Sequence, residues 1–322
     1  MFDENEYYGY ILKGDLIGGI RYTKRFPEQS ALYQRYITIF DKEQYLNYVI
    51  DEPLNDILRA YQQYYRDVFY LCLDKDKAAD KLRTMLKALL PANDEDSLDD
   101  MEQENVAGVF QRRGFYFRGG RTGGYYGPYV WKTTESRTYD VELPDGIQQY
   151  TVKLMDGFVV KSWLDYLSFG KVSTGGWTDA DGIINCVKSS YDFDSEDFRV
   201  SLLKHEAQHA RDLSLQPNMT SMLLEYRAKL VELIYSAERN LLAQFVREAD
   251  SSDDNNGHSS AAHRIVSEYC EMLDKSSDEL GMLSVEKVQS VAKTLFEKSS
   301  RAIDRTLRPD RTCPSTLSCR QA

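Results

Sequence analysis

Apolar residues at helical spacing mark the first part of the chain. From about Glu28 they recur every three or four positions, and Pro53 stands where the first turn of a helix tolerates proline. The clearest apolar stripe follows it and consists of Leu54, Ile57, Leu58, Tyr61, Tyr65, Val68, Phe69 and Cys72. Another helix is expected over 75–90, while residues 1–27 show no firm pattern. Residues 1–90 are therefore predicted to form a mostly helical N-terminal unit.

A dense run of aspartate and glutamate occupies residues 91–105. Such a block is usually solvated because its charges repel one another and little of it can be buried. The regular ligand spacing and loop glycine of a calcium-binding EF-hand are missing. We therefore predict a mobile acidic linker between two parts of the chain.

Residues 106–190 change to a strand-like pattern with many glycines. Two alternating segments flank Pro144-Asp145-Gly146, a hairpin signal, and no Gly-Lys-Ser/Thr phosphate loop follows the glycines. The predicted strands are 137–143, 148–155, 158–163 and 182–187. This part is predicted to be β-rich.

Helical spacing returns in residues 191–322. Pro217 and Asn218 separate a first helix from a second, which Thr220 or Ser221 can start and which is expected to run to about Ala249. Two further helices are expected over 261–273 and 284–307 after a polar loop. The whole chain is therefore predicted to be an α+β protein with a helical second half.

Composition narrows the possible partners and locations. The chain has 322 residues, 42% of them hydrophobic, and a net charge of −11, which argues against nucleic acids and anionic membranes as partners. No apolar run approaches a membrane span, and the acidic start lacks the order of a signal peptide, so a cytoplasmic protein is expected. The five cysteines are too scattered to suggest a disulfide framework.

The most informative motif is His205-Glu206-Ala207-Gln208-His209. On a helix, histidines four apart place both imidazoles on one face, where a single metal ion can touch them. The chain has only four histidines, so this spacing around a glutamate is a specific signal. Zinc suits imidazole ligands, and Glu206 would stand beside a zinc-bound water as its base. Asp194 or Ser195 is a plausible N-cap for this helix.

These residues resemble the zincin metallopeptidases. The metzincin branch is not indicated, because Asp212 and Leu215 occupy the places of its glycine and third histidine. The resemblance to the gluzincins, which include thermolysin-like enzymes, implies a third ligand from a glutamate on the following helix. Glu225 lies 16 residues beyond His209 and is the main candidate. Glu232, two turns later on roughly the same face, is the alternative ligand or a supporting group.

Two positions depart from the gluzincin pattern. Thermolysin-like enzymes carry an aspartate four residues after the ligand glutamate, where this chain has Lys229, and Arg211 fills a place that is usually apolar. Asp212, one turn past His209, could accept a hydrogen bond from an imidazole or could be a plain exposed residue.

The resemblance also implies a small mixed sheet before the active-site helix, with an edge strand along the cleft that can pair with an extended peptide. Residues 175–177 and 182–187 are the candidates for that strand. Thermolysin-like enzymes steady the oxyanion with a later histidine, which implies a catalytic role for His258 or His263. Tyr226 and Tyr269 are further candidates.

The expected function is that of a zinc-dependent metallopeptidase that hydrolyses peptide or protein substrates. One zinc ion per chain would be held by His205, His209 and Glu225, with Glu206 as the base. A second hypothesis is a non-catalytic zinc-binding or protein-interaction module, whose metal would be closed by a fourth ligand such as His258 or Asp212. A third is a metal-free helical interaction protein.

Overall fold

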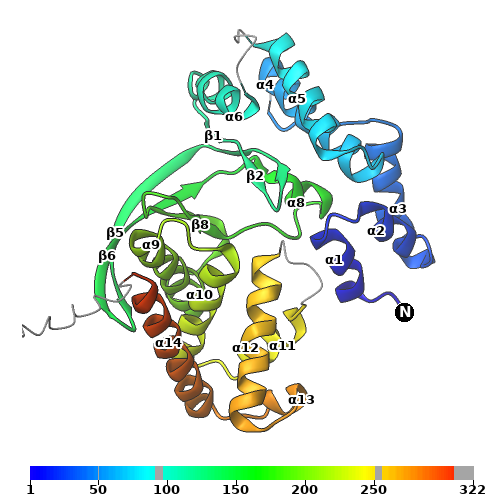
Figure 1. The fold of residues 1–322 in the computed structure, drawn as a ribbon. Helices are drawn as coiled ribbons and strands as arrows, with labels where there is room; N and C mark the ends of the chain where they lie inside the picture. The colour runs from blue at the N-terminus through cyan, green and yellow to red at the C-terminus, as the bar shows by residue number, and fades with distance from the viewer. Residues whose placement is uncertain (50, 91–96, 251–255, 308–322) are drawn as a thin grey trace, which may run out of the picture. The chain divides into compact units, whose positions relative to one another are not determined.

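The computed structural model describes all residues except 50, 91–96, 251–255 and 308–322. The fold is mixed α+β with small sheets, as predicted (Figure 1). It divides into two compact units. The first contains Met1–Arg137, Lys153–Gly175 and Asn185–Ser190, and the second contains Thr138–Val152, Gly176–Ile184 and Tyr191–Ala322.

This division differs from the predicted boundaries at 90, 105 and 190. Residues 106–137 group with the N-terminal helices because their apolar side chains, such as Phe110 and Val130, belong to the same buried cluster as Tyr61. A composition change along the chain therefore does not mark a boundary between compact units here.

Helices dominate the first unit. They are α1 (Glu4–Leu12), α2 (Leu16–Thr23), α3 (Ser30–Tyr36), α4 (Glu52–Tyr65), α5 (Lys75–Leu89), α6 (Leu98–Asp100), α7 (Ala107–Gln111) and α8 (Ser162–Leu167). The helix predicted over 75–90 is confirmed as α5. The helix predicted after Pro53 is confirmed as α4, which continues as a π-helix over Arg66–Tyr70 and ends before Cys72, an exposed residue with a φ of 53°. The lack of a firm pattern in residues 1–27 was misleading, because Asp3 and Asp15 cap two helices there with their side chains.

The acidic run is not a mobile linker throughout. Residues 91–96 lie outside the described part of the chain, but 98–106 are helical, as α6 and a π-helix over Met101–Val106. Met101 and Glu102 are buried, and the Tyr61 hydroxyl donates to Glu102 Oε1 at 2.6 Å. An acidic residue with a buried hydrogen-bond donor can join a core, which a charge count does not reveal.

The first unit also contains short strands. β1 (Tyr116–Arg118), β4 (Tyr129–Trp131) and β7 (Val160–Lys161) form an antiparallel sheet with β4 in the middle, and β2 (Arg121–Thr122) pairs with β3 (Tyr125–Tyr126). The segment 158–163 was predicted to continue the hairpin sheet. Instead, β7 pairs with β4, and Ser162 begins α8.

A four-stranded sheet has the order β5-β6-β9-β8. Its strands are β5 (Thr133–Leu143), β6 (Gly146–Asp156), β8 (Gly176–Thr178) and β9 (Ile184–Val187). The predicted hairpin is confirmed, and Gly146 has a φ of 127°, a conformation that favours glycine. Of the two candidate edge segments, β8 is last in the order, whereas β9 lies inside the sheet.

The second unit is built on helices. They are a π-helix over Asp197–Lys204, α9 (His205–Leu215), α10 (Ser221–Tyr235), α11 (Leu241–Glu248), α12 (Gly257–Leu273), α13 (Ser277–Leu280) and α14 (Val285–Leu307). α10 packs against α9, α12 and α14 and so lies at the centre of this unit (Figure 1). Its start after Thr220 is confirmed, since the Thr220 side chain caps it.

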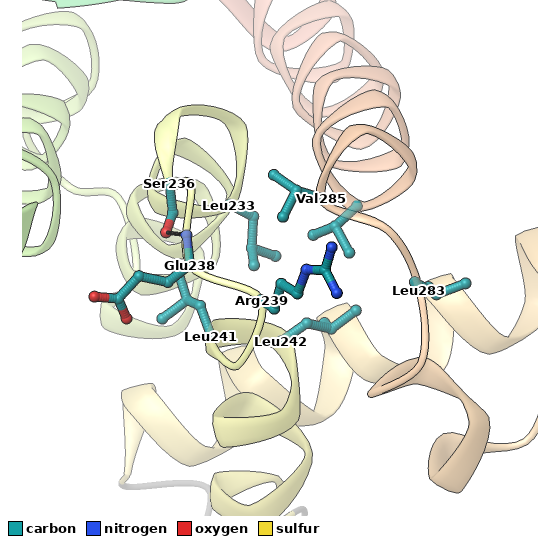
Figure 2. Close-up of a pocket in the computed structure, with 9 residues that line it drawn as sticks. Leu233, Ser236, Glu238, Arg239, Leu241, Leu242, Leu283 and Val285 are labelled. Carbon is teal, nitrogen blue, oxygen red and sulfur yellow. Dashed lines mark hydrogen bonds between the residues drawn. The ribbon is translucent and has the colours of Figure 1, made fainter.

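The predicted continuous helix from α10 to Ala249 is wrong, because the chain breaks after Tyr235. The Glu196 carboxylate accepts a hydrogen bond from the Ala237 amide at 2.7 Å and so holds the chain after the break. A cavity of about 10 Å³, lined by residues such as Leu233, Arg239 and Val285, lies beside it (Figure 2). Room for about one water molecule shows that the helices around this break are well packed.

No helix in the described ranges is both long and apolar enough to cross a membrane.

Candidate metal centre

The residues that precede the two histidines are held in place by a hydrogen bond and by buried side chains. Ser195 Oγ accepts a hydrogen bond from the Phe198 amide at 3.2 Å, as expected for a predicted N-cap. Phe198, Leu202 and Leu203 are buried, and the π-helix that they belong to passes directly into α9 at His205. A π-helical turn widens the helix, a feature often found at functional sites.

The two imidazoles converge through their Nε2 atoms. His205 Nε2 and His209 Nε2 are 3.0 Å apart, and the ring planes are at 87° to each other. Two nitrogen ligands of one tetrahedral zinc, each at 2.0–2.1 Å, would be separated by about 3.3 Å. Both histidines are buried, so the convergence is not a chance approach of mobile surface groups.

Glu225 on α10 completes the group. Its Oε2 lies 3.4 Å from His205 Nε2, and its Oε1 lies 3.5 Å from His209 Nε2. His205, His209 and Glu225 together could hold a metal ion, since one ligand atom from each lies within 4.8 Å of the others. The helix, turn and returning helix inferred from Pro217 and Thr220 therefore bring the carboxylate to the histidines.

Glu232 faces the other side of His205. His205 Nδ1 lies 2.7 Å from Glu232 Oε1, so the carboxylate is placed to accept the Nδ1 proton, and Nε2 is the nitrogen that faces Glu225 and His209. Histidines that bind metals usually donate their second nitrogen in this way, which fixes the tautomer and the ring orientation. The geometry therefore separates a ligand position, Glu225, from a supporting position, Glu232.

The charges of this group are strongly coupled. Burial opposes protonation of His205, but the carboxylates of Glu232 and Glu225 outweigh it and raise its pKa well above the ordinary value. Burial likewise opposes ionisation of Glu225, yet hydrogen bonds from His205, His209 and His258 lower the pKa of its carboxyl. Without a metal, a proton on His205 therefore compensates buried negative charge, and a bound cation would replace it.

Glu206 directly follows His205 in α9, and its carboxylate contacts β8. The Thr178 hydroxyl lies 2.7 Å from Glu206 Oε2 and 2.9 Å from the Glu206 carbonyl oxygen. Thr178 was not among the residues predicted from the sequence. The only available signal was its place directly after the predicted edge segment 175–177.

The two later histidines, His258 and His263, lie in different surroundings. His258, in the first turn of α12, has its Nδ1 2.9 Å from Glu225 Oε2, its ring 6.4 Å from the His205 ring and a side chain that is 64% exposed. His263 is exposed and lies five residues further along α12, about 140° around the helix from His258. The structure thus brings His258 to the site and leaves His263 on another face.

The two tyrosine candidates are engaged elsewhere. The Tyr226 hydroxyl contacts the Glu268 carboxylate, and the Tyr269 hydroxyl donates to the Val288 carbonyl at 2.7 Å. We call His205, His209 and Glu225 the metal group. Among the side chains proposed from the sequence to steady an oxyanion, that of His258 contacts this group, through Glu225.

The structure assigns Asp212 to a different contact from the predicted one. Asp212 is completely buried, and its Oδ2 accepts a hydrogen bond from Arg227 Nε at 2.8 Å; no imidazole contact is found for it among the described residues. Arg227 also donates to Ser299 and Ser300, so this pair joins α9 and α10 to α14. Asp212 pairs with Arg227 and not with an imidazole because the positive charge of the guanidinium compensates the buried carboxylate.

The two departures from the gluzincin pattern are also paired. Lys229 is buried, and its Nζ lies 2.9 Å from Glu248 Oε2 on α11. Arg211 lies 2.8 Å from Asp145 in the hairpin loop. Both cations therefore have carboxylate partners, and neither is in contact with His205, His209 or Glu225.

Comparison with protein-family models, with curated proteins and with solved structures found no match to this chain.

Proposed function

We propose that the chain is a zinc-dependent metallopeptidase. The observation that carries the proposal is the convergence of His205 Nε2 and His209 Nε2, 3.0 Å apart, with the Glu225 carboxylate beside both and Glu206 directly after His205 on the same helix. Two imidazoles and one carboxylate form a donor set that zinc uses in hydrolytic enzymes, with one position left for water.

The residues present fit a zinc ion. Glu232 is placed to accept the Nδ1 proton of His205, so Nε2 is the nitrogen that a zinc ion would take on displacing its proton, and the lowered pKa of Glu225 keeps that carboxylate ionised. A zinc ion held by His205, His209 and Glu225 would polarise the scissile carbonyl and lower the pKa of a coordinated water from 15.7 towards roughly 7.

The chain's own residues would then handle the substrate and the protons. Glu206 accepts the proton of the attacking water at its carboxylate and delivers it to the nitrogen of the leaving amine. His258, partly exposed at the edge of the group, is placed to donate a hydrogen bond to the developing oxyanion. A peptide or protein substrate would pair with β8, the last strand of its sheet, in an extended conformation.

The first experiment measures zinc per chain in protein purified without added metal. We expect about one zinc, and we expect its loss in H205A and E225A. E206Q should keep the zinc and lose hydrolysis of a quenched-fluorescent peptide library, because it removes the proton acceptor but no ligand. The proposal fails if no metal binds at neutral pH, or if E206Q remains fully active.

A second function, a non-catalytic zinc module, is favoured by one observation. His258 lies close enough to Glu225 to approach a metal as a fourth protein ligand, which would leave no place for water. H258A distinguishes the two functions. A closed site predicts a large loss of zinc affinity in H258A, whereas the peptidase predicts nearly unchanged affinity and a lower kcat.

A further inference from the structure

We infer that Thr178 positions the catalytic base Glu206, an assignment that rests on the proposed peptidase function. Thr178 is the last residue of β8, and Glu206 is the second residue of α9. The Thr178 hydroxyl reaches both the Glu206 carboxylate, at 2.7 Å, and the Glu206 carbonyl oxygen, at 2.9 Å. The sheet edge and the active-site helix are thus joined at the residue that would move the proton.

The shorter of the two contacts is the stronger one. A hydroxyl has one proton to donate, and a bond to an ionised carboxylate is roughly twice as strong as a bond to a neutral acceptor. The Thr178 proton therefore goes to Glu206 Oε2 when the carboxylate is charged. This bond holds one carboxylate oxygen and leaves Oε1 as the atom that can receive a proton.

Holding the carboxylate matters because a glutamate side chain has three rotatable bonds. A general base must lie within about 3 Å of the proton that it takes, and displacements of about 1 Å can lower rates about 100-fold. Threonine suits this task, since its branched side chain is restricted at χ1 and presents the hydroxyl in a defined direction from a strand. Thr178 touches neither substrate nor metal in this scheme and acts through Glu206.

The activity test compares T178V, which keeps the shape but loses the hydroxyl, with T178S, which keeps the hydroxyl. Both are assayed as full-length zinc-loaded protein on a peptide selected from the library. We expect T178V to lower kcat about 10- to 100-fold, with KM within about twofold and zinc content unchanged, and T178S to recover most of kcat. A merely structural role would instead change KM or zinc content together with kcat.

A second measurement needs neither zinc nor activity. In a chelator, the melting temperatures of the unchanged chain, T178V, E206A and the double variant form a double-mutant cycle. We expect T178V to lower the melting temperature by about 2–4 °C in the original background and by less in the E206A background, where only the weaker bond to the backbone carbonyl oxygen of residue 206 remains. Equal effects in both backgrounds would overturn the inference, because the hydroxyl would then not act on Glu206.

The two proposals can fail separately. A chain that binds no zinc and cleaves no library peptide overturns the proposed function and, with it, the role of Thr178 in catalysis. A zinc-loaded, active enzyme in which folded T178V keeps its full kcat overturns the positioning role alone. Circular dichroism of each variant establishes folding before either conclusion is drawn.

Discussion

Replacement of Arg227 by methionine should destabilise the helices that carry the metal group. Arg227 is buried, donates to Asp212 Oδ2 at 2.8 Å and lies over the Phe296 ring at 4.3 Å. Methionine keeps most of the apolar stem but removes the charge and all the hydrogen bonds. Asp212, which is 0% exposed, then remains as a buried carboxylate without its cation.

The size of the effect follows from this burial. Removing one partner of a buried ion pair lowers the free energy of unfolding by about 3–5 kcal/mol, because the remaining charge is uncompensated. For a unit of this size, each kcal/mol corresponds to about 2–4 °C in melting temperature. We therefore expect R227M to lower the melting temperature of the second unit by about 6–20 °C.

The assay is thermal unfolding and urea unfolding in a chelator at neutral pH, each followed by circular dichroism. R227M should lower the midpoint of the transition in which the second unit unfolds. The matched control is the double variant D212L/R227M. It replaces both charges by apolar groups and should recover most of the stability that R227M loses, since a buried pair is often worth no more than good apolar packing.

Two results would refute this reasoning. If R227M lowers the free energy of unfolding by less than about 1 kcal/mol at an unchanged denaturant slope, the pair is not a buried, mutually dependent charge pair. If the double variant is as unstable as R227M, the loss comes from packing around Phe296 and not from the uncompensated carboxylate.

Three further predictions concern the metal group and the buried acid of the first unit. E232A should weaken zinc binding about 10- to 100-fold in a chelator competition, because His205 loses the acceptor for its Nδ1 proton; unchanged affinity would contradict the supporting role. Zinc affinity should rise with pH, measured by the same competition, because the raised pKa of His205 makes zinc displace a proton, and a flat profile would argue against this. Burial raises the pKa of Glu102 to about 7 from 4.5, so its contribution to stability is fully present below pH 4.5 and is lost as the pH rises through about 7. The difference between the two pKa values corresponds to about 3 kcal/mol of folding free energy. E102Q should remove the contribution of Glu102 to the pH dependence of urea unfolding.

Much of the secondary structure could be predicted because its signals are local. The helix after Pro53 and the hairpin at Pro144-Asp145-Gly146 depend on neighbouring residues alone, and both are confirmed. The break after Tyr235 could not be predicted in the same way. The apolar spacing continues across it, and a distant carboxylate, Glu196, holds the chain there.

Burial of charged residues was the main source of error. Glu102 and Asp212 were expected to be solvated or to face an imidazole, yet each is buried against a partner far away in the sequence, Tyr61 and Arg227. Whether a charged residue is exposed depends on the presence of such a partner. The partner is known only once the chain is folded.

The sequence by itself determined the pair of histidines. Four residues are slightly more than one helical turn, so any helix through 205–209 places both imidazoles on one face. It did not determine which glutamate completes the group, because Glu225 and Glu232 are seven residues apart and differ by only about 20° around the helix. Only the tertiary structure decided this. Seven helical residues separate the two carboxylates by about 10 Å along α10. The packing of α10 against α9 places His205 between them, so that one faces its Nε2 and the other faces its Nδ1. The approach of Thr178 and His258 was decided in the same way, since contacts between distant segments depend on packing and not on spacing along the chain.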